Sequence, residues 1–333
     1  MQAIDLILDK DKDLNTTNID LIVDAGITTI AQCASDVQQA KSVDDIKQIV
    51  KNDSWLDDWK LESRKNSKVW YSVASKFDTF CKSIRKDCMF LADGLRSFSL
   101  ESDIKLVRPT VLESSVERTL VPKLQHQMTL NSSYSAGYID WFQQADNYSG
   151  DLFWCPPSIK AAGVYTYTDA YFHPWDAPAG MTRGIVMGAV DVSFNPMNDE
   201  AGRIYAASWN YAKSYPEDGI VIEGQKTFQK SPTALDRINV RRLLLSLEKK
   251  ARAAAKYFKY EGNTEYLRNK FLDILRPIFD DAIDGKGISQ YAMLCDETNN
   301  TADVIDNNEM RCQVAVKPIK CIEWIVLDFI CTN

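Results

Sequence analysis

A long amphipathic helix, predicted over residues 239–260, constrains the fold of this chain more than any other stretch. Its apolar side chains recur at steps of three and four, the spacing of a helix with one buried stripe. They are Val240, Leu243, Leu244, Leu247, Ala251, Ala254, Ala255 and Phe258. The opposite side is basic and carries Arg241, Arg242, Lys249, Lys250, Arg252, Lys256 and Lys259. Asn239 is a suitable N-cap, and Gly262 with Asn263 ends the helix. A solvated face of snorkelling lysines would explain the basic side, and so would a docking surface for an acidic partner.

The composition narrows the class of protein. The 333 residues are enough for two domains, and the net charge of -7 argues against nucleic acid as a partner. No run approaches the roughly eighteen apolar residues of a membrane span, so no membrane insertion is expected. The N-terminus lacks the pattern of a signal peptide, and the eight cysteines contain no C-x-x-C pair. We expect reduced thiols and a cytosolic site of synthesis.

The first half of the chain has the pattern of an α/β layer. Residues 1–17 are polar and are expected to be a frayed or cut edge. The segment 18–28, with its apolar centre Leu21-Ile22-Val23, is predicted to be a buried strand that runs into a turn. With a helix over Val69–Arg85 and a strand at Cys88–Ala92, it predicts parallel strands joined by a helix. A further strand (104–112) and helix (116–127) follow. A hairpin turn is then predicted at 147–150, and a helix that begins at the Pro156-Pro157 pair.

The second half is predicted to be α+β, with a domain boundary at the rigid segment 175–180. The domains are therefore expected to be 1–180 and 181–333. A strand is predicted at 184–192 and a helix at 198–212, followed by a strand at 219–223. Beyond the basic helix we expect a helix over 264–284, kinked or split near Pro277, and then strands at 290–295, 311–317 and 321–331.

The last predicted strand is unusual for a chain end. Cys321–Cys331 is apolar on both faces except at Asp328, which suits a strand covered on both sides. Two interpretations remain open: a central strand of its own domain, or a strand exchanged into the sheet of a neighbouring subunit.

A search for catalytic motifs gives no site. The two histidines, His126 and His173, have no metal-ligand spacing, and there is no G-x-S-x-G, G-x-G-x-x-G or P-loop. We predict no catalytic, cofactor-binding or metal-binding residues. The acidic stretch 296–309 could hold calcium, although it lacks the glycine of an EF-hand loop and also suits a plain turn. Trp141, Tyr148 and Trp154 could form a sugar-stacking platform or a packed core.

Several linked motifs resemble those of tail-sheath proteins from contractile-tailed phages. The segments are FWCPPSIKAAGVYTYTD (153–169), PWDAPAG (174–180), INVRRLL (238–244), LCDETNNTADVIDNNE (294–309) and the closing VAVKPIKCIEWIVLDF. The resemblance is strong over residues 133–333 and weaker before them. It implies a structural protein and not an enzyme. A sheath subunit of this kind has an α/β domain followed by an α+β sheath domain with a strand-exchanging terminus.

The resemblance also implies partners and a location. Sheath subunits form stacked hexameric rings, a helical sheath around a tail tube, bounded by a baseplate and a tail terminator. Contraction drives the tube through the host envelope, and assembly takes place in the host cytoplasm before the protein becomes part of the virion tail. The residues expected to contact other subunits or the tube are Arg241, Arg242, Lys249, Lys250, Arg252, Lys256, Ile322, Trp324, Val326 and Phe329.

The sequence departs from the family at its beginning. The extended N-terminal arm of sheath proteins is not recognisable in residues 1–17, which predicts a fragment of a longer sheath protein from a giant phiKZ-like phage. Other readings stay open: the sheath of a bacterial contractile injection system or pyocin, more distantly an α/β hydrolase-like enzyme, and a carbohydrate-binding module.

Overall fold

The computed structural model describes residues 8, 11–12, 17–28, 63–94 and 130–323. They belong to two compact units, Met1–Leu245 and Ser246–Asn333, called here the first and the second unit. Among the described residues, no helix is both long and apolar enough to cross a membrane. The predicted elements at 104–112 and 116–127 and nearly all of the predicted strand 321–331 lie outside the described residues.

A five-stranded sheet organises the first unit, with the strand order β1-β2-β3-β7-β8. The strands are β1 (Leu21–Val23), β2 (Met89–Asp93), β3 (Ser135–Tyr138), β7 (Trp209–Tyr215) and β8 (Gly219–Glu223). The first four run parallel and β8 pairs antiparallel to β7. All five residues of β2 are buried, as expected for a central strand covered on both faces.

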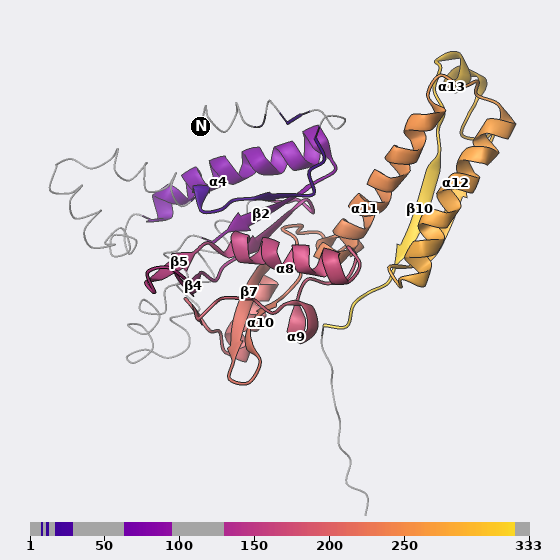
Figure 1. Ribbon diagram of the computed structural model, residues 1–333. Helices are drawn as coiled ribbons and strands as arrows, with labels where there is room; N and C mark the ends of the chain where they lie inside the picture. Colours follow the sequence, from indigo (N-terminus) through magenta and orange to yellow (C-terminus); the bar gives the residue numbers. More distant parts are fainter. Residues whose placement is uncertain (1–7, 9–10, 13–16, 29–62, 95–129, 324–333) are drawn as a thin grey trace, which may run out of the picture. The chain divides into compact units, whose positions relative to one another are not determined.

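Helices cover both faces of this sheet (Figure 1). The helix α4 (Ser63–Thr79) continues into one π-helical segment, η3 (Phe80–Arg85), and packs with α10 (Asn198–Ala206) on the face of Phe90 and Ala92. The helix α8 (Pro157–Tyr171) covers the opposite face, where Met89 and Leu91 point. The alternation of side chains along β2 thus separates two hydrophobic clusters, one on each face.

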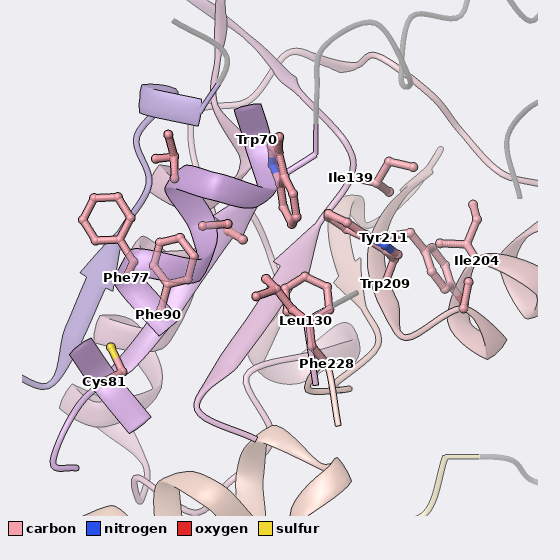
Figure 2. Packing of buried hydrophobic residues seen from close by; sticks show 14 of the residues in the cluster. Trp70, Phe77, Cys81, Phe90, Leu130, Ile139, Ile204, Trp209, Tyr211 and Phe228 are labelled. Atoms are coloured by element: carbon pink, nitrogen blue, oxygen red, sulfur yellow. The ribbon is translucent and has the colours of Figure 1, made fainter. Parts of the chain in front are cut away.

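Aromatic rings fill the first of these clusters (Figure 2). Trp70, Trp209 and Phe228 lie with ring centroids 5.1 to 6.4 Å apart. Gly137 in β3 is required beside them, because a Cβ atom at that position would lie 2.3 Å from the Phe228 ring and 2.7 Å from Trp209. The strand and the aromatic cluster therefore depend on one another.

A smaller antiparallel sheet lies beside the main one, in the order β5-β4-β6. It consists of β4 (Phe142–Ala145), β5 (Leu152–Cys155) and β6 (Asp191–Val192). The predicted hairpin turn joins β4 to β5 and is confirmed. The short helix α9 (Gly180–Arg183) and the 3-10 turn η4 (Ala234–Asp236) complete the connections.

The second unit consists of helices and a two-stranded antiparallel sheet. The helix α11 (Ile238–Ala255) begins in the first unit and ends in the second, where the 3-10 turn η5 (Lys256–Phe258) follows it. The other elements are α12 (Glu265–Asp284), β9 (Ile288–Leu294), α13 (Ala302–Asp306) and β10 (Gln313–Pro318). The helix α12 buries Phe271, Leu275 and Phe279 at a helical spacing, and Phe279 contacts Tyr291 of β9 at a centroid distance of 5.4 Å.

The mixed α/β class is confirmed, whereas the layout differs from the one expected. A division at Gly180 would cut the main sheet, because β7 and β8 follow that residue and β7 pairs with β3. The segment 184–192 is not one strand: only Asp191–Val192 is, with an isolated bridge at Ile185. The helix predicted over 198–212 ends at Ala206, because residues 209–212 enter the sheet.

Two details of the helices also differ. The helix α11 begins at Ile238, so Asn239 lies in its first turn and is not its N-cap. The helix α12 is a single continuous element although Pro277 lies inside it. The remaining predicted elements are confirmed to within a few residues: the strands at Leu21, Cys88, Gly219, Gln290 and Arg311 and the helices at Val69 and Pro156.

Candidate functional site

Two members of the expected basic docking surface lie inside the first unit. Arg241 and Arg242 are 6% and 7% exposed. The Arg241 guanidinium donates to the Ser133 hydroxyl and lies 4.1 Å from the centroid of the Tyr134 ring. A buried guanidinium is tolerated only with partners of this kind. The expectation that Arg241 lies on an open docking surface is therefore corrected.

Arg242 is held in the same way from a neighbouring helix. It forms an ion pair with Asp169 of α8 and lies 4.6 Å from the centroid of the Tyr165 ring. The Tyr165 hydroxyl is in turn 3.0 Å from that of Tyr138, and burial raises the pKa of Tyr165 to about 12. Arg242 thus attaches the start of α11 to α8 and β3, and it too is removed from the expected surface.

The remaining basic residues of the helix belong to the second unit and stay accessible to different degrees. Lys250 lies 3.3 Å from Asp281 and Arg252 lies 3.6 Å from Glu248, all four side chains being 44% to 59% exposed. Pairs as exposed as these contribute about 1 kcal/mol or less to stability. Lys249 is half-buried, whereas Lys256 is exposed at the end of the helix.

Exposed aromatic rings surround this end of the helix. Tyr257, Tyr260 and Tyr266 are 86%, 103% and 76% exposed. Tyrosine is one of the residue types enriched at protein interfaces, because its ring is rigid and carries one polar tip. The end of α11 and the start of α12 therefore form a surface of tyrosines and lysines, which the sequence analysis did not single out.

The sheet of the second unit has strand edges without a strand partner. It contains only β9 and β10 in the part of the chain that the structure describes. Their register pairs Leu294 with Gln313 and Gln290 with Lys317. A two-stranded sheet is marginal by itself, and an unpaired edge is a template for another strand. Ile322, just beyond β10, is 81% exposed, while Trp324, Val326 and Phe329 lie outside the described residues.

The acidic stretch 296–309 forms the loop between β9 and β10. Asn300, which is 2% exposed, donates to the carbonyls of Asp296 and Arg311 and accepts from the Arg311 amide. Thr298 donates two hydrogen bonds to Asp296 and lowers the pKa of that carboxyl. Across the described residues no group of three potential ligands could hold a metal ion. The Asn-Asn motif of this loop therefore has a structural explanation.

The carboxyl edge of the parallel sheet is where an α/β enzyme would bind its substrate. In this chain the start of α8 lies there, and its Ser158 amide donates to the Asp93 carboxylate at 2.6 Å. The same carboxylate accepts from the Ser158 hydroxyl and from the Gly26 amide. Burial, followed by the charge of Asp24, raises the pKa of Asp93 to about 8. The donors that could bind a substrate anion are thus used by the protein itself.

The rings considered as a sugar platform do not form one. Trp141 is buried at 6% exposure and its indole N–H donates to the Gly94 carbonyl, whereas Tyr148 is 99% exposed. A stacking platform needs several accessible rings side by side. Trp141 is instead part of the packing of the first unit.

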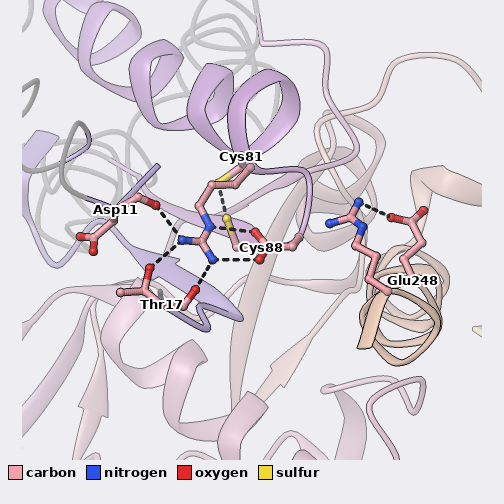
Figure 3. A network of polar contacts seen from close by, with 8 residues as sticks. Asp11, Thr17, Cys81, Cys88 and Glu248 are labelled. Atoms are coloured by element: carbon pink, nitrogen blue, oxygen red, sulfur yellow. Dashed lines mark hydrogen bonds and ion pairs between the residues drawn. The ribbon is translucent and has the colours of Figure 1, made fainter. Parts of the chain in front are cut away.

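A buried arginine fixes part of the N-terminal region and was missed in the sequence. All five N–H donors of Arg85 are used: two bonds go to the Asp87 carboxylate, and three go to the Asp11 carbonyl and to the carbonyl and hydroxyl of Thr17 (Figure 3). The region was expected to be a frayed edge; the structure describes only residues 8, 11, 12 and 17 of it, and among these Asp11 and Thr17 are bonded to Arg85. Arg85 is the last residue of the predicted amphipathic helix, and nothing in the sequence around it indicates which residues it bonds to.

The fold defines the class of protein that this chain resembles. The sheath of an extracellular contractile injection system, the PVC sheath complex in its contracted state, superposes with a TM-score of 0.61 at 18% identity over 77% of this chain and 67% of that one. A chain of the anti-feeding prophage baseplate gives the same TM-score at 20% identity, covering 80% of this chain and 65% of the other. The fold is therefore that of contractile sheath proteins.

Sequence comparison leads to particular relatives. The tail sheath protein of Vibrio phage KVP40 is 29% identical over 253 residues, which are 75% of this chain and 38% of the relative. The tail sheath protein of Enterobacteria phage T4 is 30% identical over 207 residues, 62% of this chain and 31% of the relative. No family model matches the chain. The resemblance to phage tail sheath proteins is thus confirmed, and the chain spans about a third of the length of these relatives.

Proposed function

We propose that this chain is a structural subunit of a contractile tail sheath. Copies of it would polymerise as stacked hexameric rings around a tail tube, between a baseplate and a tail terminator, and contract to drive the tube through the host envelope. Assembly would take place in the host cytoplasm and the product would be the virion tail. The similarity to tail sheath proteins of two phages and the sheath-like fold support this function.

One structural observation carries the proposal. The sheet of β9 and β10 presents edges without a strand partner among the described residues, in a unit with little core of its own. A strand from another subunit would complete this sheet through main-chain hydrogen bonds, which give affinity with little demand on side chains. The apolar segment Cys321–Cys331 is the proposed donor strand. Its side chains proposed to contact the neighbouring subunit, on either face of the strand, are Ile322, Trp324, Val326 and Phe329.

Electrostatic contacts would supplement the exchanged strand. Lys249, Lys250 and Arg252 lie on the part of α11 in the second unit, and Lys256 lies in η5 directly after it; all four are proposed to face another subunit or the tube. Each exposed contact contributes about 1 kcal/mol or less. Many weak contacts of this kind can break one after another, whereas the exchanged strands keep the subunits connected during contraction.

A matched pair of variants tests the exchanged strand. Val326→Pro removes a backbone donor and opposes an extended pairing, whereas Val326→Thr keeps a β-branched residue at the same position. We expect both variants to keep the thermal unfolding of the parent chain, and we expect only Val326→Pro to abolish ordered polymers in light scattering and negative-stain microscopy. Polymers of normal order from Val326→Pro would contradict the proposed strand exchange.

A bacterial contractile injection sheath is the second candidate, favoured by the structural neighbours. It shares the proposed assembly and differs in what the sheath is attached to. Particles purified with the native protein decide between them: a head filled with DNA supports the phage sheath, and its absence supports the injection system.

A further inference from the structure

Two cysteines face one another where the loop 296–311 leaves the two-stranded sheet. Leu294 of β9 pairs with Gln313 of β10. Cys295 directly follows β9 and Cys312 directly precedes β10, so extending the register by one residue places them opposite one another. Cys295 is 4% exposed and Cys312 is half-exposed, so reagents in solution can reach the pair through Cys312.

The register of the pair fits a disulfide. Directly opposed residues of an antiparallel sheet have Cα atoms about 4.5 or 5.5 Å apart, depending on the type of pair. Disulfides span Cα distances of about 4.4 to 6.8 Å. Opposed residues on neighbouring strands direct their side chains to the same face of the sheet, so the register places both thiols on one side. The bond can therefore form with little movement of the strands.

A second pair of thiols provides an internal comparison. The sulfur atoms of Cys81 and Cys88 lie 3.5 Å apart, so this pair too is close enough to be considered for oxidation. Both side chains are fully buried in the first unit, and the hydrogen bond with the Cys88 thiol, followed by burial, raises the pKa of Cys81. A thiol that no reagent reaches stays reduced, because exchange needs direct contact with the attacked disulfide. Accessibility thus separates two pairs that proximity does not.

We propose that Cys295 and Cys312 form a disulfide when the protein meets a small-molecule disulfide, and that this bond closes the loop 296–311 at the end of β9 and β10. The Cys312 thiolate attacks a small disulfide, which forms a mixed disulfide and releases one small thiol. The Cys295 thiolate then attacks the Cys312 sulfur and releases the second small thiol. One disulfide is reduced to two thiols, and two cysteines are oxidised to one cystine.

The redox conditions and the pH around the protein determine when the disulfide forms. The proposed function supplies the setting: a sheath subunit is made in a reducing cytoplasm and then leaves the cell with the particle, and disulfides persist outside the cell. Burial, followed by the neighbouring thiol, raises the pKa of Cys312 to about 12, and burial raises that of Cys295. Thiolates are scarce at neutral pH, so the reaction is slow there and accelerates as the pH rises.

The crosslink would strengthen the part of the molecule that is proposed to accept a strand. It ties β9 to β10 at the end where Asn300 already connects Asp296 to Arg311. A disulfide removes conformational freedom from the unfolded chain. The register of the acceptor sheet would then be fixed covalently in the released particle and only non-covalently during assembly.

Oxidised glutathione is the probe for the test, applied to the purified full chain at pH 8.5. The protein is quenched with an alkylating reagent, digested without reductant and analysed by mass spectrometry. We expect a peptide pair joined through Cys295 and Cys312 that has lost two hydrogens, while Cys81 and Cys88 are recovered as alkylated thiols after denaturation. Cys295→Ser and Cys312→Ser should each abolish this crosslink, and Cys321→Ser should leave it intact.

Two results would overturn the inference: alkylated Cys295 and Cys312 after prolonged exposure, or Cys312 joined to a different cysteine. The readout is chemical and needs no polymer. Failure of the crosslink in a chain that assembles therefore overturns this inference alone, whereas a normal crosslink in a chain that never assembles leaves the inference standing and contradicts the sheath function.

Discussion

The two units bury their apolar side chains in different ways. The first unit places two hydrophobic clusters on the two faces of one sheet and provides internal partners for its buried arginines. The second unit has a small buried set around Phe271, Leu275 and Phe279, a sheet of two strands and several tyrosines that are more than 75% exposed. In the sheath proposed above, we therefore expect neighbouring copies to cover the second unit and not the first.

Removing a buried aromatic ring should produce the largest difference between the units in the free energy of unfolding. Phe228→Ala deletes a wholly buried ring between Trp70 and Trp209, and we expect it to lower the free energy of unfolding by about 3 to 5 kcal/mol. Tyr257→Ala in the second unit is the control and should change it by about 0.5 kcal/mol or less. Denaturant unfolding measures both. Equal losses would show that the exposed tyrosine is part of a core.

Substituting a buried and an exposed charged residue tests the same difference between the two units. Arg242→Ala leaves Asp169 without its partner and opens space over Tyr165, so we expect a loss of about 2 to 4 kcal/mol. Lys256→Glu changes an exposed residue and should leave the free energy of unfolding within about 0.5 kcal/mol of the parent while weakening polymer formation. If Arg242→Ala unfolds like the parent chain, the arginine is not structural.

The pH dependence should come from buried carboxyls of the first unit. Burial raises the pKa of Asp140 well above its usual range, and its Oδ1 has no hydrogen-bond partner among the described residues. The folded state therefore holds a proton that the unfolded state releases from about pH 4 upward. The contribution of Asp140 to stability is present in full below that pH and is lost as the pH rises towards the raised pKa.

Asp140→Asn tests this smaller effect. The amide oxygen can still accept from the Ala212 N–H, and the side chain no longer ionises. We expect the unfolding temperature of the variant to fall less than that of the parent chain between pH 5 and pH 9, with Asp146→Asn on the surface as the control. Parallel curves for parent and variant would contradict a protonated Asp140.

The local sequence pattern was sufficient to predict a helix or strand where a single preference, such as the spacing of apolar residues, determines the element. The apolar steps of α11, the prolines that open α8 and the short apolar run of β2 all predicted the element that forms. The linked motifs were sufficient to predict the sheath-like fold, because several of them occur in the same order. The sequence did not predict boundaries that depend on strand pairing: residues 209–212 pair with β3 and β8 instead of extending α10.

The candidate surface was predicted less well, since a sequence does not show which partners fold back onto it. Arg241 and Arg242 follow the same basic stripe as Lys256, yet Ser133, Asp169 and two tyrosines far away in the chain enclose them. The Arg85 network and the pairing of Cys295 with Cys312 were missed for the same reason. Only the register of β9 and β10 reveals the second of these.

Hydrogen–deuterium exchange, compared between the dispersed chain and its polymer, tests most directly whether neighbours complete the second unit. We predict that the amides of β9 and β10 exchange much more slowly in the polymer, because a strand from another subunit pairs with their free edge, while β2 and β3 in the first unit exchange alike in both states. Unchanged exchange in β9 and β10, with new protection confined to the first unit, would contradict the account.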